Sequence, residues 1–149
     1  MIVAVACDHA GFALKAVVIE AVNEAGHQAL DLGVNNQESV DYPDVAIMLG
    51  RSIQAGQAER GILLCGSGVG ASITANKLSG VYAGVCHDTY SAHQAVENDD
   101  MNVLCLGARV IGPELAKELA AAYLSANFWP EERHVRRVQK IRALEQVKS

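Results

Sequence analysis

A thiol followed by alternating glycines is the part of this 149-residue sequence best suited to chemistry. Cys65 ends a short apolar run, 62–64, which is typical of a buried parallel strand. The residues that follow alternate between glycine and other types: Gly66, Ser67, Gly68, Val69 and Gly70. Glycine lets a backbone adopt positive φ and approach a ligand closely, and a helix predicted from residue 71 adds amide groups that attract an anion. The same field favours the thiolate of a cysteine, so we interpret Cys65 as a proton-transfer base beside a loop that stabilises a negatively charged oxygen.

Other interpretations of this stretch stay open. A glycine turn between a strand and a helix can bind nothing, and a free cysteine is often a small buried hydrophobe. The spacing Gly66-x-Gly68-x-x-Ala71, with Asp88 further on, also fits a loose dinucleotide fingerprint, which would make the protein a nucleotide-binding oxidoreductase. No Lys-Ser/Thr pair follows the last glycine, so the stretch is not a P-loop. A zinc site is conceivable, although its ligands would have atypical spacing: Cys7, Asp8, His9 and Cys65.

The composition narrows the class of protein. The net charge of −5 predicts no general attraction to nucleic acid or to a membrane surface, and no long apolar segment is present. The four cysteines lack CxxC spacing, which favours reduced thiols and a cytoplasmic location over a disulfide framework. At this length we expect one domain over 1–149.

Apolar strand-like runs alternate with segments of helical spacing along the whole chain. The predicted strands are 2–6, 28–32, 61–64, 81–86 and 102–106. The predicted helices are 12–25, 42–55, a helix from 71, 89–97, 112–125 and 131–147. Such alternation predicts an α/β fold: a Rossmann-like, three-layer α/β/α sandwich with a five-stranded parallel sheet and an extra C-terminal helix.

Polar and titratable residues gather where the predicted strands end. In parallel sheets ligands bind beyond the carboxyl ends of the strands, so these segments should lie around one site. The segments are Cys7-Asp8-His9, Cys65-Gly66-Ser67, Cys86-His87-Asp88 and Gly107-Ala108-Arg109.

The last predicted helix is basic in an otherwise acidic chain. Arg133 and Arg137 are four residues apart and share a helix face. This can be a solvated surface, or the two guanidinium groups can grip a phosphate or carboxylate. A terminal helix that follows the break at Trp129-Pro130 could also reach a neighbouring subunit.

Several motifs together resemble the ribose-5-phosphate isomerase B family, which also includes allose- and galactose-6-phosphate isomerases. The resemblance covers nearly the whole chain and rests on Cys7-Asp8-His9-Ala10-Gly11, Asp41-Tyr42-Pro43, 61–70, Ala75-Asn76-Lys77, Asn102-Val103-Leu104 and 107–112. It implies an aldose–ketose isomerase that needs no metal or other cofactor. It also implies a homodimer or dimer of dimers in which the subunits share their active sites.

The resemblance further implies roles for individual residues. Cys65 matches the base that moves a proton between C1 and C2 through a cis-enediolate. Ser67 and the amides of Gly66, Gly68, Val69 and Gly70 match the anion hole. Asp8 and Tyr42 match sugar-contacting positions. The phosphate grip corresponds to His9, Arg109 and, from the partner subunit, Arg133, His134 and Arg137.

One segment departs from the family pattern. Where the family has His-Asn-Asp, with a histidine that helps to open the sugar ring, this chain has Asn98-Asp99-Asp100. Asn98 can donate a hydrogen bond to the ring oxygen but cannot exchange a proton near neutral pH. Asp99, His93 or His87 could act instead. We expect a ribose 5-phosphate isomerase, with a hexose 6-phosphate isomerase and a non-catalytic sugar-phosphate-binding module as alternatives.

Overall fold

Five parallel strands form a single sheet in the order β2-β1-β3-β5-β4. The computed structural model describes residues 1–147 of the chain. The strands are β1 (Ile2–Cys7), β2 (Gln28–Asp31), β3 (Arg60–Cys65), β4 (Ala83–Val85) and β5 (Val103–Gly107). The three central strands are buried along almost their whole length, as expected for a sheet covered on both faces.

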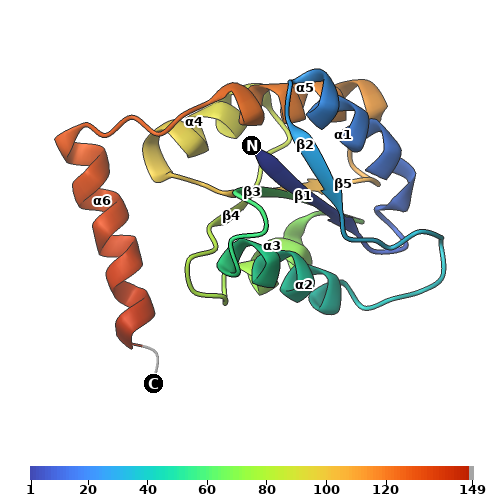
Figure 1. Cartoon of the computed structure of the whole chain (residues 1–149), viewed down its shortest axis with the longest axis horizontal. Coiled ribbons are helices and arrows are strands. Elements are labelled where there is room, and N and C mark those ends of the chain that lie inside the picture. Colours follow the sequence, from blue (N-terminus) through green and yellow to red (C-terminus); the bar gives the residue numbers. More distant parts are fainter. Residues whose placement is uncertain (148–149) are drawn as a thin grey trace.

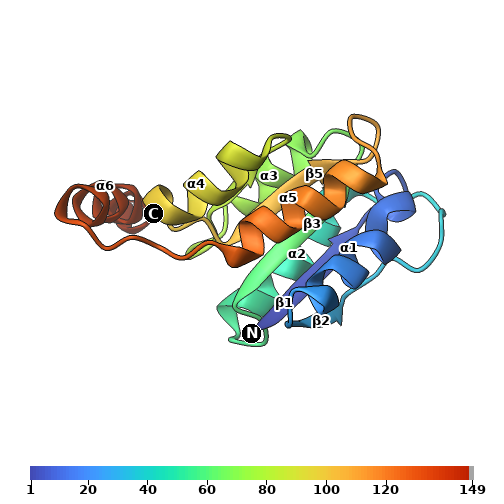
Figure 2. The same cartoon turned by 90° about the horizontal axis from the view of Figure 1, so that it is seen from above.

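Helices cover both faces of this sheet, and one helix stands apart from it (Figure 1). The helices are α1 (Phe12–Glu24), α2 (Tyr42–Gln54), α3 (Val69–Ala75), α4 (Thr89–Asp99), α5 (Pro113–Ser125) and α6 (Glu132–Ala143). Helices α1, α4 and α5 lie on one face and α2 and α3 on the other, while α6 extends beyond the sheet (Figure 2). The predicted three-layer α/β/α sandwich with an extra C-terminal helix is confirmed.

Alternation along each strand divides the core into two clusters. Val3, Val5 and Cys7 of β1 point toward α1 and α5, in the larger cluster. The residues between them in β1, Ala4 and Ala6, belong with Cys65 of β3 to the cluster under α2 and α3. Cys7 and Cys65 therefore lie on opposite faces of the sheet.

The parallel register brings the predicted functional segments to one edge. Cys7 pairs with Leu64 and Cys65 pairs with Gly107. The ladder continues beyond the strands, because the Ala108 amide donates to the Cys65 carbonyl at 2.8 Å and the Arg109 amide to the Gly66 carbonyl at 3.1 Å. The loops after β3 and β5 are therefore held together by their own backbones.

Two predicted elements differ from the structure in extent more than the others. The fourth strand is shorter than predicted, since the Tyr82 amide donates to the Asn102 side chain at 2.8 Å instead of to a strand neighbour. The C-terminal helix ends at Ala143 and continues as a 3₁₀ turn, η1 (Leu144–Val147). None of the helices within residues 1–147 has the length and apolar character that crossing a membrane requires.

Candidate active site

A cavity of about 400 Å³ opens at the carboxyl edge of the sheet. Segments that follow β1, β3 and β5, together with the start of α2, form its walls. The lining residues are Asp8, His9, Ala10, Tyr42, Cys65, Gly66, Ser67, Gly70, Arg109 and Val110. The structure thus brings together eight of the fifteen residues predicted for the site, with Ala10 and Val110 in addition. Gly68 and Val69 belong to the same loop but do not line the cavity.

Cys65 lies at the inner wall of this cavity, and its side chain is only 5% exposed. The Gly68 amide donates a hydrogen bond to Sγ at 3.1 Å. Gly68 has φ +83°, a backbone conformation that glycine adopts without strain, and it turns the chain from β3 into α3. The turn therefore places a backbone amide donor directly against the sulfur atom at the inner wall of the cavity.

The loop after Cys65 is shaped by close packing. A Cβ atom on Gly70 would lie 2.6 Å from the Tyr42 ring, so a side chain there would displace the tyrosine. The Ser67 hydroxyl accepts a hydrogen bond from the Val69 amide at 3.2 Å. The amides at the start of a helix have no carbonyl partner four residues earlier, and those of α3 start at this loop. Backbone donors and the Ser67 hydroxyl therefore lie next to the thiol.

The loop before α2 determines which nitrogen of His9 carries a proton. The Val40 amide donates to His9 Nδ1 at 3.2 Å. An amide can only donate, so Nδ1 must offer its lone pair and the ring proton resides on Nε2. This arrangement leaves the Nε2–H group of His9 as the donor available to a ligand. No sequence signal points to Val40, since its backbone and not its side chain makes the contact.

Asp8 is a buried carboxylate, 5% exposed, beside His9. Its Oδ1 accepts the Gly11 amide at 2.9 Å, immediately before α1. This contact leaves the second oxygen of Asp8 for a hydroxyl group in the cavity. Arg109 is exposed and also lines the cavity, with its side chain beside Gly66.

A buried lysine, not predicted from the sequence, anchors the loop that carries Val40. Lys15 is 6% exposed, and its ammonium group donates three hydrogen bonds. The acceptors are Asp31 Oδ1 at 2.9 Å, the Val34 carbonyl at 2.7 Å and Asn35 Oδ1 at 2.8 Å. Lys15 therefore ties α1 to the end of β2 and to the start of the 32–41 loop.

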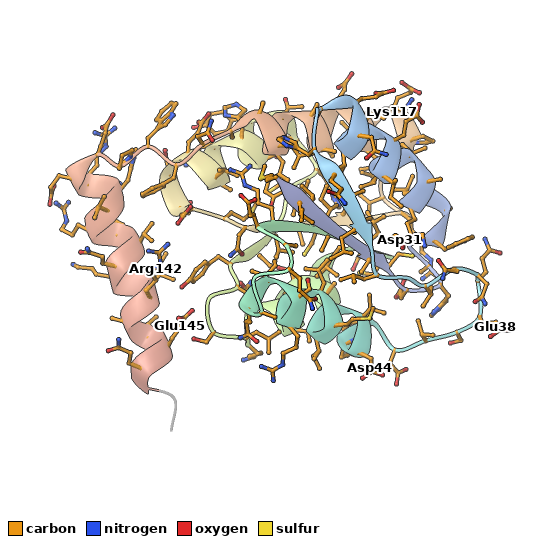
Figure 3. The ribbon with its side chains drawn as sticks, viewed as in Figure 1. Asp31, Glu38, Asp44, Lys117, Arg142 and Glu145 are labelled. Atoms are coloured by element: carbon orange, nitrogen blue, oxygen red, sulfur yellow. The ribbon has the colours of Figure 1, made fainter. Side chains whose placement is uncertain are left out.

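We expect Lys15→Met to lower the free energy of unfolding by about 1.5–3 kcal/mol, the range for hydrogen bonds to a charged group. Lys117→Met is the matched control, because Lys117 points outward from α5 (Figure 3) and should change stability by less than about 0.5 kcal/mol. Urea unfolding followed by circular dichroism measures both. Equal midpoints for the two variants would show that the Lys15 contacts do not stabilise the fold.

The other predicted residues do not lie at this cavity in the same chain. Helix α4 begins near the carboxyl edge and runs back along the sheet, so Asn98 and Asp99 lie at its far end. Asp99 lines a different cavity of about 260 Å³, together with Tyr82, Met101 and Ile141 among others. Arg133, His134 and Arg137 lie on α6, which extends away from the sheet.

The two alternative histidines are engaged elsewhere. The Gly107 amide donates to His87 Nε2 at 3.0 Å, and burial lowers the pKa of this histidine. His93 lies on α4, with Nδ1 3.1 Å from a Glu97 carboxylate oxygen. Neither ring lines the cavity that contains Cys65.

The described residues contain no cluster of ligands that would support the zinc interpretation. Among residues 1–147, no group of three or more His, Cys, Asp or Glu side chains is arranged to hold a metal ion. Cys7, one of the ligands considered, faces away from Cys65 across the sheet, and its Sγ lies 3.7 Å from the Val34 carbonyl oxygen. Burial raises the pKa of the Cys7 thiol, which disfavours the thiolate that binds zinc.

A cysteine thiol, a glycine-rich loop with backbone amide donors and an arginine meet at the carboxyl edge of a parallel sheet, the edge where proteins of this fold class bind their ligands. Comparison with known proteins identifies the family to which this chain belongs. The family model described as ribose/galactose isomerase matches residues 3–141. The chain belongs to the ribose/galactose isomerase family.

Individual relatives agree with this assignment. Ribose-5-phosphate isomerase B of Escherichia coli is 42% identical over 144 residues, covering 97% of this chain and 96% of the relative. D-erythrulose-4-phosphate isomerase of Pectobacterium atrosepticum is 45% identical over 127 residues, covering 85% and 84%. The structure of ribose-5-phosphate isomerase B from Mycoplasma genitalium with bound ribulose-5-phosphate is 34% identical, with a TM-score of 0.90 over 97% of this chain and 96% of that one.

Proposed function

We propose that this protein interconverts ribose 5-phosphate and ribulose 5-phosphate. The Escherichia coli relative and the Mycoplasma structure with its bound ketose phosphate support a phosphorylated sugar as substrate. The observation that carries the proposal is the Cys65 thiol in one cavity with Ser67, His9 and Arg109. The cysteines are all free thiols, which supports a reducing location such as the cytoplasm.

In the proposed mechanism Cys65 is the base. Its thiolate removes the proton from C2 of the open-chain aldose, and the electron pair moves onto the carbonyl oxygen to give a cis-enediolate. The loop amides of 66–70 and the Ser67 hydroxyl stabilise the negative charge on the enediolate oxygens. A proton then moves from O2 to O1 of the enediolate and the Cys65 thiol returns its own proton to C1, so that C2 becomes the carbonyl carbon of the ketose. Asp8 and Tyr42 hold the sugar hydroxyl groups.

The phosphate is gripped from two subunits in this proposal. His9 and Arg109 come from the chain that supplies Cys65. Arg133, His134 and Arg137 come from a partner, because α6 extends away from its own cavity. Asn98 and Asp99 come from the partner for the same reason, since they lie at the far end of α4. A homodimer, alone or within a dimer of dimers, supplies both sets of residues.

A tetrose 4-phosphate is a second candidate substrate. The relative from Pectobacterium atrosepticum, 45% identical, is named for D-erythrulose 4-phosphate. A tetrose 4-phosphate cannot close a furanose ring, because the oxygen that would attack C1 carries the phosphate. It therefore needs no ring opening, which suits a chain with Asn98 in the position where its family has a histidine. Ribose 5-phosphate and a hexose 6-phosphate both close a ring, so the native protein would turn over either one only through its open form unless another group opens the ring.

The direct test compares isomerisation of ribose 5-phosphate, a hexose 6-phosphate and the tetrose pair under equal conditions. A substrate preference for the tetrose would replace the pentose in our proposal. Sugar phosphate bound without turnover would make the protein a binding module. Binding of NAD(P) in a calorimetric titration, with no isomerisation, would support the oxidoreductase alternative.

Replacing Asn98 by histidine tests the ring-opening step. With ribose 5-phosphate we expect the native protein to show a burst from the open form, and then a rate that stops rising with protein concentration because spontaneous ring opening limits it. In Asn98→His the histidine should open the ring by general acid–base catalysis, so the rate should keep rising with protein concentration. At about ten times the protein concentration at which the native plateau begins, the variant should therefore be about tenfold faster than the native protein. Rapid mixing with a ketose-specific assay measures both phases.

Substrates without a ring provide the control for Asn98→His. Ribulose 5-phosphate and tetrose 4-phosphates are open, so their rates should follow protein concentration in both forms. If the native protein shows no plateau, another group already opens the ring. A selective loss with Asp99→Asn or His93→Ala in the aldose direction would then identify it.

A further inference from the structure

Helix α6 is an arm that has few contacts with the rest of the chain. Of the residues in Glu132–Ala143, His134 and Val138 are buried. Arg133 and Arg137 are exposed on the arm. A helix with so little buried surface needs other contacts to hold its direction.

The first attachment lies at the beginning of the arm. The Trp129 amide donates to the Glu97 carbonyl of α4 at 2.9 Å. His134 Nδ1 lies 3.0 Å from the Trp129 carbonyl oxygen, so its donated proton fixes the first turn of α6 to the segment before it. One attachment point at this end leaves a helix free to swing about it.

The second attachment lies at the other end of the 12-residue helix, which is about 18 Å long by helix rise, and it holds two charged side chains (Figure 3). Arg142 Nη2 donates to Asp100 Oδ2 at 2.5 Å, and the guanidinium lies 5.7 Å from the centre of the Tyr82 ring. Glu145 accepts two hydrogen bonds, from the Gly80 amide at 2.9 Å and from the Ser79 hydroxyl at 3.1 Å. We call Arg142 and Glu145 with these partners the latch.

We propose that the latch is a positioning device that fixes the direction of α6, so that Arg133 and Arg137 reach the phosphate in the partner's site. The inference rests on the proposed function, in which the arm acts across subunits. Asp100 follows Asn98 and Asp99 directly, so the latch also ties the arm to the end of α4. Both segments proposed to enter the partner's site therefore move as one unit.

The test removes the latch charges and compares the result with a matched loss of charge. The latch variant is Arg142→Met with Glu145→Gln. The control is Arg136→Met with Glu132→Gln, an ion pair 2.5 Å long within the same helix that does not touch the sheet. Both variants lose one arginine and one glutamate from the same C-terminal region.

In the latch variant we expect KM for ribose 5-phosphate to rise about tenfold, with kcat near native. A tenfold rise in KM corresponds to about one arm in ten being correctly placed to bind the phosphate. The control should stay within about twofold. The Gly80 amide, freed from Glu145, should exchange its hydrogen faster in the latch variant, and the fluorescence anisotropy of Trp129, the only tryptophan, should fall.

Each other outcome is decisive. Equal changes in KM for both variants would mean that helix charge, and not the latch, matters. Faster Gly80 exchange with an unchanged KM would show that the latch holds the arm but does not position it for substrate, which overturns the inference. If Arg137→Ala then also leaves KM unchanged, the proposed phosphate grip fails as well; if it raises KM, the grip stands without the latch.

Discussion

Serine in place of Cys65 is expected to lower kcat for ribose 5-phosphate isomerisation by about 10²- to 10⁴-fold, the usual contribution of a general base. A hydroxyl group ionises far too weakly near pH 7 to remove a proton from carbon, although it fills nearly the same space. KM should change by less than about threefold, because the thiol acts on the proton that is transferred and not on the phosphate. Steady-state kinetics and a binding titration of ribulose 5-phosphate measure the two effects separately.

The control for Cys65→Ser is Cys86→Ser. Cys86 also lies near the carboxyl edge, but its thiol belongs to the core cluster on the other face, and burial raises its pKa to about 11. Its replacement should leave kcat near native once folding has been checked by circular dichroism. A Cys65→Ser protein with near-native kcat would show that another group is the base.

Alanine in place of Arg137 is expected to weaken phosphorylated sugars by about ten- to hundredfold, since a charge-assisted hydrogen bond contributes roughly 1.5–3 kcal/mol. The matching unphosphorylated sugars should lose little affinity. Similar losses for both would make Arg137 a structural residue and not part of the phosphate grip. Inhibition by each ligand gives the affinities directly.

Mixing the two variants, assayed at ribose 5-phosphate well below the KM of Arg137→Ala, where each variant alone has little activity, shows whether the arm acts across subunits. Cys65→Ser supplies an intact arm, and Arg137→Ala supplies an intact thiol. In a symmetric dimer each mixed pair contains one complete site, so full exchange should restore about a quarter of the native sites. Exchange is verified by native mass spectrometry. Complete exchange without recovered activity would place the arm in its own subunit's site.

The sheet and most of the cavity were predictable because strand ends in a parallel sheet meet at one edge. Asp8, Cys65 and Arg109 follow three different strands, and the register brings them together. The position of Asn98 was also implicit, since a helix of eleven residues after β4 must carry its end back to the other edge.

Other parts of the site have no signal in the sequence. Lys15 occupies a helix position that looks solvent-exposed until β2 and the following loop fold against it. Val40 acts through its amide, which every residue except proline has. The placement of β5 between β3 and β4 depends on which strands pair, and neither hydrophobic pattern nor turn residues specify that choice.

The backbone contacts that continue past β3 and β5 have a consequence for binding. Ordering the backbone of one free residue costs roughly 1–2 kcal/mol. At Gly66 and Arg109 the hydrogen bonds between the two loops offset this cost during folding, before any ligand binds. A ligand therefore encounters main-chain donors already in place and loses little affinity to ordering them. In the proposed mechanism, the free energy of its contacts then remains available to stabilise the enediolate.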